Sequence, residues 1–413
     1  MKLIALWRAT VPLAVLLTVL VGCSSDKDNN DTEPRQPATP VSVSWQRSQA
    51  AISLDNFSQV HLSGIMRLHQ QTVNDIAFSQ HGTRMASVGA DNNTVVWNLA
   101  NGESLFVQGD NDGRRVFFGP DDDTVITVNR DGLVRVWRMN MSPPSTLEET
   151  IHFDGYEGQE EIVVQSPDRK LLAFGARNGG IRLWQMPEGN MIADFQGYFR
   201  SIQALAFSPD STRLVAVSPD PNLRVWSVPD AELVYELTSD IGTPSQITFS
   251  PDSRWMAAAS QSGILIWDME TGEMVHSITA GDSAAASALA FSPDGKLLSA
   301  CGMQPVIGIW DVATGEMLGG LPIPGQTCSG LAFSPDSKLL LTLPIQGQNV
   351  YLWDISHIAD DVPADQKMLR QRDRENMGLI PGSRFYKIFW SDDGRFIVLV
   401  DELGPIYVLS AAQ

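Results

Sequence analysis

Positive charge is scarce in this chain of 413 residues. It has 29 Lys and Arg residues against 48 Asp and Glu residues, which gives a formal net charge of −19. Because nucleic-acid binding requires a basic surface, this balance excludes DNA or RNA as an expected partner. The acidic excess is explained by solubility, and a preference for basic partners is the alternative explanation.

Cysteine is equally rare. The three residues are Cys23, Cys301 and Cys328, too few and too widely spaced for a disulfide-rich scaffold or a zinc site. Cys301 and Cys328 lie in or beside apolar strands of neighbouring repeats. We expect two buried thiols there, and a disulfide in an oxidising compartment is the alternative.

Motifs that carry catalysis are missing as well. The six His residues lie at least eight residues apart, and there is no His-Glu-x-x-His, phosphate-binding Gly-Lys-Ser/Thr or Gly-x-Ser-x-Gly segment. We therefore expect a protein that is not an enzyme and that holds no cofactor and no metal.

No apolar run is long enough to cross a bilayer, which requires roughly 20 residues. The longest run, residues 9–21, follows Lys2 and Arg8 and is typical of the hydrophobic region of a secretory signal peptide. It ends in Leu20-Val21-Gly22-Cys23, which resembles the lipobox of bacterial lipoproteins. The resemblance implies that residues 1–22 are removed and that Cys23 is lipidated. An ordinary signal peptide followed by a chance cysteine is the alternative.

Residues 23–51 are predicted to form the lipidated cysteine and a disordered tether. Up to Val41 the segment is polar and acidic, contains three prolines and has almost no apolar residues to bury. In the lipoprotein family, Asp directly after the cysteine favours the inner membrane, and here that residue is Ser24. The resemblance thus implies an anchor in the outer membrane, with the protein facing the periplasm or the cell surface and touching the membrane only through its lipid.

Residues 52–413 consist of one repeating unit. A short apolar strand ends in Ser-Pro-Asp-Gly or Ser-Pro-Asp-Ser, which is a turn signal, and a second apolar strand follows. A Gly, Asp or Asn turn then leads to a third strand that ends in an aromatic residue, and a last stretch supplies a fourth. The aromatic residues recur every 40 to 54 residues, at Trp97, Trp137, Trp184, Trp226, Trp267, Trp310, Trp353 and Tyr407. Four short antiparallel strands in each unit predict the blades of an all-β, closed β-propeller.

The unit resembles the WD repeat, and Trp-Asp itself occurs at Trp267, Trp310 and Trp353. In that family a Gly-His pair precedes the first strand, and its His joins a buried network with Asp, Ser or Thr and Trp. Here only the first unit keeps all four residues, as His69, Ser87, Asp91 and Trp97. The resemblance therefore implies that most blades depend on apolar packing.

Eight units predict eight blades, with seven blades and an irregular unit as the alternative. The leading stretch 58–65 reads as a fourth strand without the preceding three, and the last unit ends at Tyr407 to Leu409 without a fourth strand. Pairing the two would close the ring and remove its exposed edges.

Two segments are candidate partner-binding sites. Tyr198, Phe199 and Arg200 lie between a fourth strand and the next first strand, and these residue types dominate binding hot spots. The alternative is a Tyr packed where the family has His, with Phe199 folded inward. The second candidate is the long basic excursion 357–384, which carries Arg370, Arg372 and Arg374. One interpretation of this excursion is a solvated fourth strand followed by a loop. The other is a docking arm or an intramolecular cover for the acidic face.

The favoured function is a membrane-anchored protein–protein interaction scaffold of the bacterial envelope, whose protein partners the sequence does not identify. One alternative is a subunit of an outer-membrane assembly machine, by analogy of architecture. The other is a hydrolase or lactonase that uses the propeller channel.

Overall fold

A computed structural model of the chain divides it into two units, Met1–Ser42 and Val43–Gln413. The structure describes residues 50–109, 113–130, 132–140, 146–154, 160–195, 198, 200–220, 222–240, 242–260, 262–279, 286–302, 306–323, 328–344, 350–358, 371–372, 379, 384–391 and 393–411, all in the second unit. The predicted signal peptide, Cys23 and nearly all of the tether lie outside these residues.

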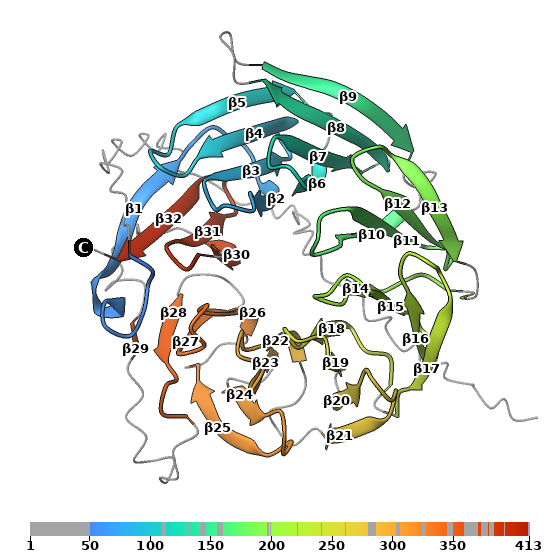
Figure 1. Cartoon of the computed structure of the whole chain (residues 1–413). Helices are drawn as coiled ribbons and strands as arrows, with labels where there is room; N and C mark the ends of the chain where they lie inside the picture. Colours follow the sequence, from blue (N-terminus) through green and yellow to red (C-terminus); the bar gives the residue numbers. More distant parts are fainter. Residues whose placement is uncertain are drawn as a thin grey trace, which may run out of the picture. The chain divides into compact units, whose positions relative to one another are not determined.

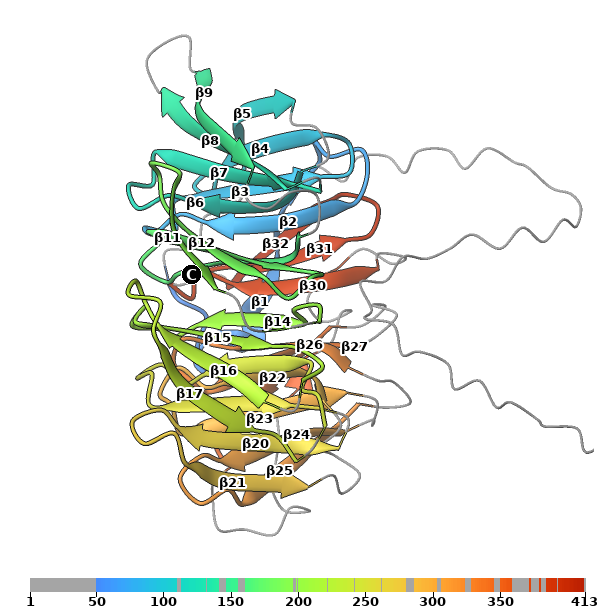
Figure 2. The same cartoon turned by 90° about the vertical axis from the view of Figure 1, so that its right-hand side faces the viewer.

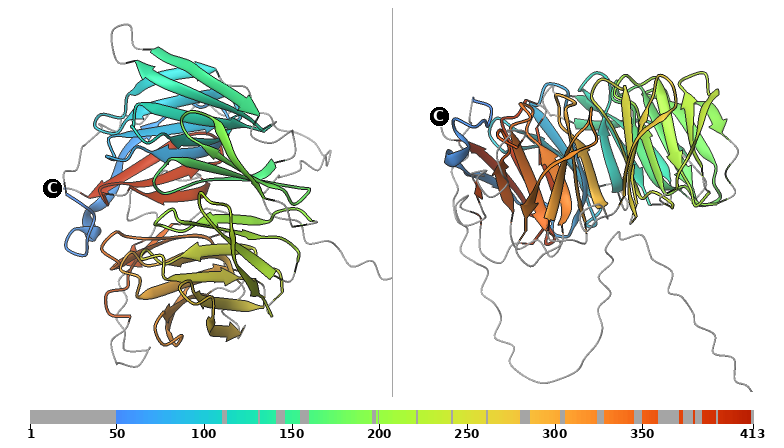
Figure 3. Two further views of the ribbon diagram at one scale, coloured as in Figure 1. Left: turned by 45° about the vertical axis from the view of Figure 1, so that its right-hand side comes forward. Right: turned by 90° about the horizontal axis from the view of Figure 1, so that it is seen from below.

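The second unit is a β-propeller of eight four-stranded antiparallel sheets, so the prediction of eight blades is confirmed. Figure 1 shows the sheets arranged around a centre, with the first strand of each blade innermost and the last at the rim. Turned views show the same ring from its side and from below (Figures 2 and 3). The single helix among the described residues is the short 3-10 helix η1 (Phe57–Gln59).

The blades are numbered here along the chain, and their strands are given from the centre outwards. Blade 1 consists of β2 (Val73–Phe78), β3 (Arg84–Gly89), β4 (Asn93–Asn98) and β5 (Ser104–Gly109), and blade 2 of β6 (Gly113–Phe118), β7 (Thr124–Asn129), β8 (Leu133–Asn140) and β9 (Thr146–Asp154). Blade 3 consists of β10 (Glu160–Gln165), β11 (Leu171–Ala176), β12 (Ile181–Gln185) and β13 (Asn190–Phe195), and blade 4 of β14 (Ala204–Phe207), β15 (Arg213–Val217), β16 (Asn222–Ser227) and β17 (Leu233–Thr238). Blade 5 consists of β18 (Gln246–Phe249), β19 (Trp255–Ala259), β20 (Gly263–Asp268) and β21 (Met274–Thr279), and blade 6 of β22 (Ala286–Phe291), β23 (Leu297–Gly302), β24 (Val306–Asp311) and β25 (Met317–Pro322). Blade 7 consists of β26 (Cys328–Phe333), β27 (Leu339–Pro344), β28 (Tyr351–Asp354) and β29 (Gln371–Arg372), and blade 8 of β30 (Phe385–Trp390), β31 (Ile397–Asp401), β32 (Ile406–Ala411) and β1 (Val60–Met66).

The ring closes through strands from the two ends of the propeller. Strand β1 pairs antiparallel with β32, with Val60 opposite Ala411 and Met66 opposite Ile406. Inside this joint the Ser63 and Ser410 hydroxyls are hydrogen-bonded at 2.5 Å, and both residues are buried. The predicted seam is therefore confirmed, and it leaves no blade incomplete.

The apolar core lies between neighbouring blades. One cluster of buried residues joins Leu183 and Phe195 of blade 3 to Ile202, Phe207 and Trp226 of blade 4. The second and third strands are apolar on both faces because each blade is covered on both sides, which accounts for runs such as Leu339–Pro344 in β27.

In blades 3 to 7 a Ser-Pro-Asp turn links the first strand to the second, and several of these turns also join adjacent blades. In blade 4 the Ser208 hydroxyl donates to Asp210 at 2.5 Å and accepts from the Arg213 amide at 3.0 Å. The Asp210 amide in turn donates to the Ser253 hydroxyl of blade 5 at 3.0 Å. Equivalent bonds join Asp168 to Ser211 and Asp294 to Ser337. The first Ser of the motif therefore stabilises its own turn, and the last Ser joins that turn to the previous blade.

A disulfide joins blades 6 and 7. Cys301 of β23 and Cys328 of β26 form this bond with their Cα atoms 5.5 Å apart, and both residues are fully buried. The expectation of two free thiols is wrong, because adjacent blades bring residues 27 positions apart face to face.

The seven predicted Trp anchors occupy equivalent positions on the third strand of blades 1 to 7, opposite residues such as Leu214 and Leu340 of the second. In blade 8 that register position belongs to Leu409, which is opposite Ile397. The interpretation of Tyr407 as the eighth anchor is therefore wrong by two residues. Tyr407 and Leu409 are two residues apart on β32 and lie in the same buried cluster, so the sequence pattern did not distinguish them.

Opposite each Trp of blades 1 to 6 the fourth strand contains one extra residue, a β-bulge. In blade 4, for example, Trp226 is opposite Leu233 while Val225 is opposite Tyr235, so Val234 is the extra residue. A bulge interrupts the strict alternation of side chains between the two faces. Two consecutive residues of the outermost strand can therefore both face the solvent at the rim.

Candidate protein-binding surfaces

The turn that enters blade 1 holds the four-residue network expected from the WD resemblance. The Trp97 indole N–H donates to the Ser87 hydroxyl at 2.8 Å, and that hydroxyl is bonded to His69 Nε2 at 2.8 Å. His69 Nδ1 donates to Asp91 at 2.9 Å, and Asp91 also accepts from the Gln70 amide at 2.9 Å. Burial alone would raise the pKa of Asp91, but the hydrogen bonds from His69 and Gln70 outweigh it and lower the pKa.

Other blades keep only parts of this network. The indoles of Trp137 and Trp353 donate to the hydroxyls of Thr127 and Thr342, at 2.9 and 3.1 Å. In blade 6, Trp310 is buried in an apolar cluster.

In blade 4 the His position is filled by Tyr198, which is only 6% exposed. Its hydroxyl donates to the Ala216 carbonyl at 2.8 Å and accepts from the Arg224 amide at 2.9 Å, where the pairing of β15 with β16 ends. Its ring lies edge-on to Trp226 and beneath the Arg224 guanidinium. The hypothesis of an exposed Tyr198 is therefore wrong, and the alternative of a packed Tyr at the His position holds, because a Tyr spans the gap that His and Ser fill in blade 1.

Of its two neighbours, Phe199 lies outside the described residues. Arg200 is exposed at the surface of the same turn, and its carbonyl accepts from the Ser218 hydroxyl at 3.1 Å. Arg200 stays a predicted partner-binding residue.

The basic excursion supplies the fourth strand of blade 7. Backbone pairing places Arg372 opposite Leu352 and Gln371 opposite Trp353, so this part of the excursion is the expected outermost strand. Arg370 and Arg374 lie outside the described residues, and the proposal of a docking arm stays a prediction.

Toward the channel, Asp75 of β2 joins three blades. Its carboxylate lies 3.1 Å from Lys387 Nζ of β30 and 3.5 Å from the Arg115 guanidinium of β6, and it accepts from the Val116 amide at 3.3 Å. This residue is 7% exposed. A carboxylate that is engaged by two cations and an amide holds blades 8, 1 and 2 together rather than serving as a general base.

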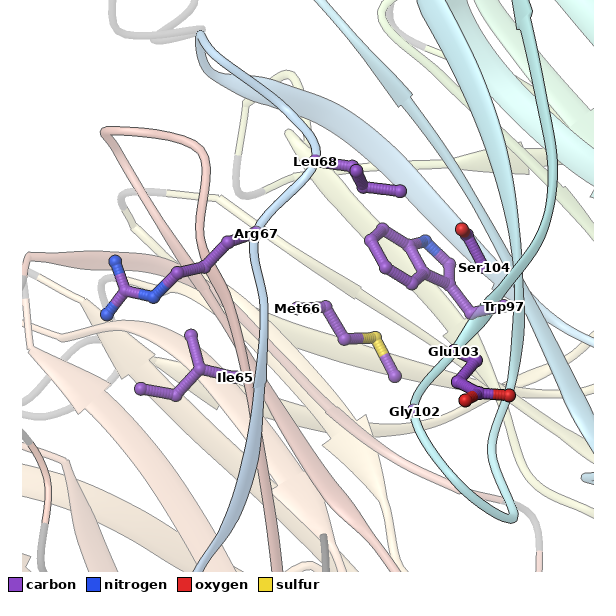
Figure 4. A pocket seen from close by; sticks show the side chains of 8 residues that line it. All are labelled: Ile65, Met66, Arg67, Leu68, Trp97, Gly102, Glu103 and Ser104. Carbon is purple, nitrogen blue, oxygen red and sulfur yellow. The ribbon is translucent and has the colours of Figure 1, made fainter. Parts of the chain in front are cut away.

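A shallow pocket lies on the rim between blades 8 and 1 (Figure 4). Residues 65–68 line one side, and Trp97 with residues 102–104 lines the other. The equivalent gap between blades 4 and 5 is filled by Tyr235, which packs on Gly272. In blade 8 the corresponding position is Gly64, which has no side chain to fill the space.

One apolar surface at the rim was not predicted from the sequence. Large exposed apolar residues gather at the bulges of blades 3 to 6, where the exposed fractions are 50% for Met191, 37% for Ile192, 51% for Leu233, 39% for Val234, 48% for Met274, 38% for Val275 and 47% for Met317. The signal was two consecutive apolar residues directly after each turn between the third and fourth strands. We name these side chains the rim stripe.

Among the described residues, no group of three or more His, Cys, Asp or Glu side chains is placed to hold a metal ion. The same part of the chain contains no helix that is long and apolar enough to cross a membrane.

Comparison with known proteins supports the repeat assignment. The family model described as WD domain, G-beta repeat matches residues 61–98, 189–227, 232–268 and 272–311. Each match begins in or within two residues of the outermost strand of one blade and ends in the third strand of the next, which is the offset that lets β1 close the ring. The chain thus carries four WD40 repeats within an eight-bladed propeller, a fold typical of protein–protein interaction scaffolds. No curated protein sequence matches it significantly.

Solved structures share the fold at low identity. Sqt1 from Chaetomium thermophilum is 19% identical with a TM-score of 0.70, and the alignment covers 85% of this chain and 99% of that one. Chaetomium thermophilum Sqt1 bound to the N-terminus of the ribosomal protein L10 is 19% identical with a TM-score of 0.68, covering 84% and 98%. The computationally designed Ika8 protein is 21% identical with a TM-score of 0.66, again covering 84% and 98%.

Proposed function

We propose that this protein is a lipid-anchored protein–protein interaction scaffold of the bacterial envelope, and that it binds its partners without catalysing a reaction. The observation that carries the proposal is a closed propeller with WD40 repeats that follows a lipobox-like segment ending at Cys23. Neighbouring blades are joined by backbone, side-chain and disulfide bonds, so the loops and rim form a preorganised surface.

The disulfide between Cys301 and Cys328 supports an exported location. Disulfides persist in oxidising compartments such as the periplasm and are rare in the cytosol. The lipid would then hold the propeller near one membrane, which confines the search for partners to its surface. Ser24 favours the outer membrane in this proposal, by the resemblance to lipoproteins.

Membrane fractionation tests the anchor. Cys23→Ala is expected to move the protein from the membrane to the soluble fraction, whereas Ser24→Ala leaves it membrane-bound. Ser24→Asp is expected to shift it from the outer to the inner membrane. An unchanged membrane fraction of Cys23→Ala would refute lipidation at this residue.

Partner binding is tested by photo-crosslinking in cells from positions 200 and 372, followed by mass spectrometry. Specific protein adducts from either position support the scaffold. If neither position yields a protein, both predicted surfaces fail.

A further inference from the structure

We propose that the rim stripe of blades 3 to 6 is a docking surface for a basic, amphipathic segment of a partner protein. This inference rests on the proposed function, and it adds a specific surface and the chemistry of the partner. It starts from the seven exposed apolar side chains on the four consecutive outermost strands β13, β17, β21 and β25. In Figure 1 these strands follow one another along one side of the ring.

The fold does not require apolar residues at these bulges. The same bulge is formed by Ser104 and Leu105 in blade 1 and by Glu149 and Thr150 in blade 2. Opposite Leu409 in blade 8, it is formed by Leu62 and Ser63. Backbone geometry thus accepts polar residues here, and exposed Met, Leu, Ile and Val side chains need another explanation. Contiguous exposed apolar side chains on a soluble protein mark interaction sites.

Hydrogen bonds link the successive blades of the stripe from blade 4 to blade 6. The Tyr235 hydroxyl of β17 donates to the Glu270 carbonyl at 2.8 Å, in the turn that leads to the apolar pair of blade 5. His276 of β21 lies 3.2 Å from the Ala313 carbonyl, in the turn that leads to Met317 of blade 6. Each outermost strand therefore supports the next apolar pair, and a single elongated partner can contact several blades.

The formally charged residues of the four outermost strands and of the turns that precede them are all acidic. Exposed acids stand in the turns and at the strand starts, at Glu188, Asp230, Glu232, Glu270, Glu273 and Glu316. None of the six has a salt bridge among the described residues. No Lys or Arg occurs in 188–195, 230–238, 270–279 or 313–322. Arg182 and Arg224 of the third strands pair with Asp194 and Glu236 in the same blades.

These features select one class of partner. The unpaired acids favour cationic groups and disfavour anionic ones, while the apolar pairs require apolar side chains in the same segment. Met191, Met274 and Met317 are flexible and polarisable, and such side chains adapt to varied apolar surfaces. A segment with basic and apolar residues on adjoining faces satisfies both requirements.

Fluorescence anisotropy with defined peptides tests the inference. The probe is a fluorescein-labelled, 18-residue helical peptide of leucine and lysine with the leucines on one face, and a leucine–glutamate peptide of the same pattern is the comparison. Every protein sample is the full chain with Cys23→Ala, so that no lipid accompanies it. We expect the lysine peptide to bind, and its affinity to fall as the salt concentration is raised. We expect no binding of the glutamate peptide.

Two variants address the two parts of the surface. The polar variant combines Leu233→Ser, Val234→Thr, Met274→Ser and Val275→Thr, which are residue types that blades 1 and 2 use at the same bulge positions. The charge variant combines Glu232→Gln, Glu273→Gln and Glu316→Gln. We expect the polar variant to raise the Kd of the lysine peptide about tenfold or more, and the charge variant to raise the Kd and flatten its salt dependence.

The control variant combines Glu103→Gln, at the equivalent strand start of blade 1, with Leu403→Ser, which removes a large apolar side chain that is 79% exposed and lies outside the stripe. It is expected to bind as the parent does. Equal binding by the parent and both stripe variants, or an equal loss in the control, would overturn the inference.

Two further measurements test whether a membrane or a second copy of the chain occupies the stripe instead. Stripe-dependent binding of zwitterionic lipid vesicles, or stripe-dependent dimerisation in sedimentation velocity, would overturn the inference in favour of a membrane or a second copy. Cys23 is replaced in every sample, so a negative result for the stripe leaves the anchored scaffold standing. A soluble Cys23→Ala protein that still binds the peptide supports both proposals.

Discussion

Two tyrosines whose hydroxyl groups are buried make opposite predictions about stability. The Tyr198 hydroxyl has two backbone partners, the Ala216 carbonyl and the Arg224 amide. The Tyr386 hydroxyl is buried with no hydrogen-bond partner among the described residues. Phenylalanine retains the ring in both cases, so the two substitutions differ in the hydrogen bonds they remove.

For Tyr198→Phe we expect a loss of about 2 kcal/mol in the free energy of unfolding. A buried donor or acceptor left without a partner costs about 1–3 kcal/mol, and relaxation of the two strand ends recovers part of the cost for two such groups. For Tyr386→Phe we expect no loss or a small gain, because an unsatisfied buried hydroxyl is removed.

Urea denaturation followed by tryptophan fluorescence measures both variants, and Trp226 reports directly on the surroundings of Tyr198, with ring centroids 6.1 Å apart. Equal losses in the two variants, or a loss well below 1 kcal/mol for Tyr198→Phe, would refute the reasoning. Tyr235→Phe is the surface control, since its bond to the Glu270 carbonyl is exposed and is expected to contribute at most about 1 kcal/mol.

The same two tyrosines predict a dependence on alkaline pH. Burial raises the pKa of Tyr198 above the ordinary 10.0, against the opposing charge of Arg224. Burial, then the charge of Asp75, raises the pKa of Tyr386. Because the folded state binds these protons more tightly, the associated stability is complete below about pH 10 and is lost as the pH rises above it. Each Phe variant should lose less stability than the parent between pH 9 and 11.

Three further outcomes are expected. Replacing Cys301 and Cys328 with Ser should lower the free energy of unfolding by about 3.5 kcal/mol on a chain-entropy model, and dithiothreitol should reduce the Tm of the parent but not of the variant. Burial would raise the pKa of Asp210, but the hydrogen bonds from Ser208 and Thr212 outweigh burial and lower the pKa. The stability that these bonds contribute is therefore present above about pH 4 and is lost as the pH falls. Asp210→Asn should flatten this acid dependence of the free energy of unfolding, measured by urea denaturation at a series of pH values. Gly272→Ala should cost about 2 kcal/mol by thermal melting, because φ is +75° and the new Cβ would lie 2.6 Å from the Tyr235 ring, and a neutral effect would contradict that geometry.

Much of the fold was determined by local patterns in the sequence. Ser-Pro-Asp turns and third-strand Trp residues recur because each blade repeats the same turn and the same buried position, so they predicted four-stranded blades and their number. The seam was also predictable, since an unpartnered first strand and an incomplete last unit require each other. The blade 1 network followed from four residues at family spacing, and its bonds are present.

Only the tertiary structure decided which side chains face the solvent and which distant residues meet. Tyr198 is buried because the adjoining strands leave a gap that fits it, and Cys301 meets Cys328 because adjacent blades stack. The rim stripe depends on a bulge in each outer strand, and two consecutive apolar residues in the sequence do not show by themselves whether both side chains face the solvent. Sequence fixes the unit of the propeller by short-range chemistry, while exposure and cross-blade contacts are set by the packing of eight units around one axis.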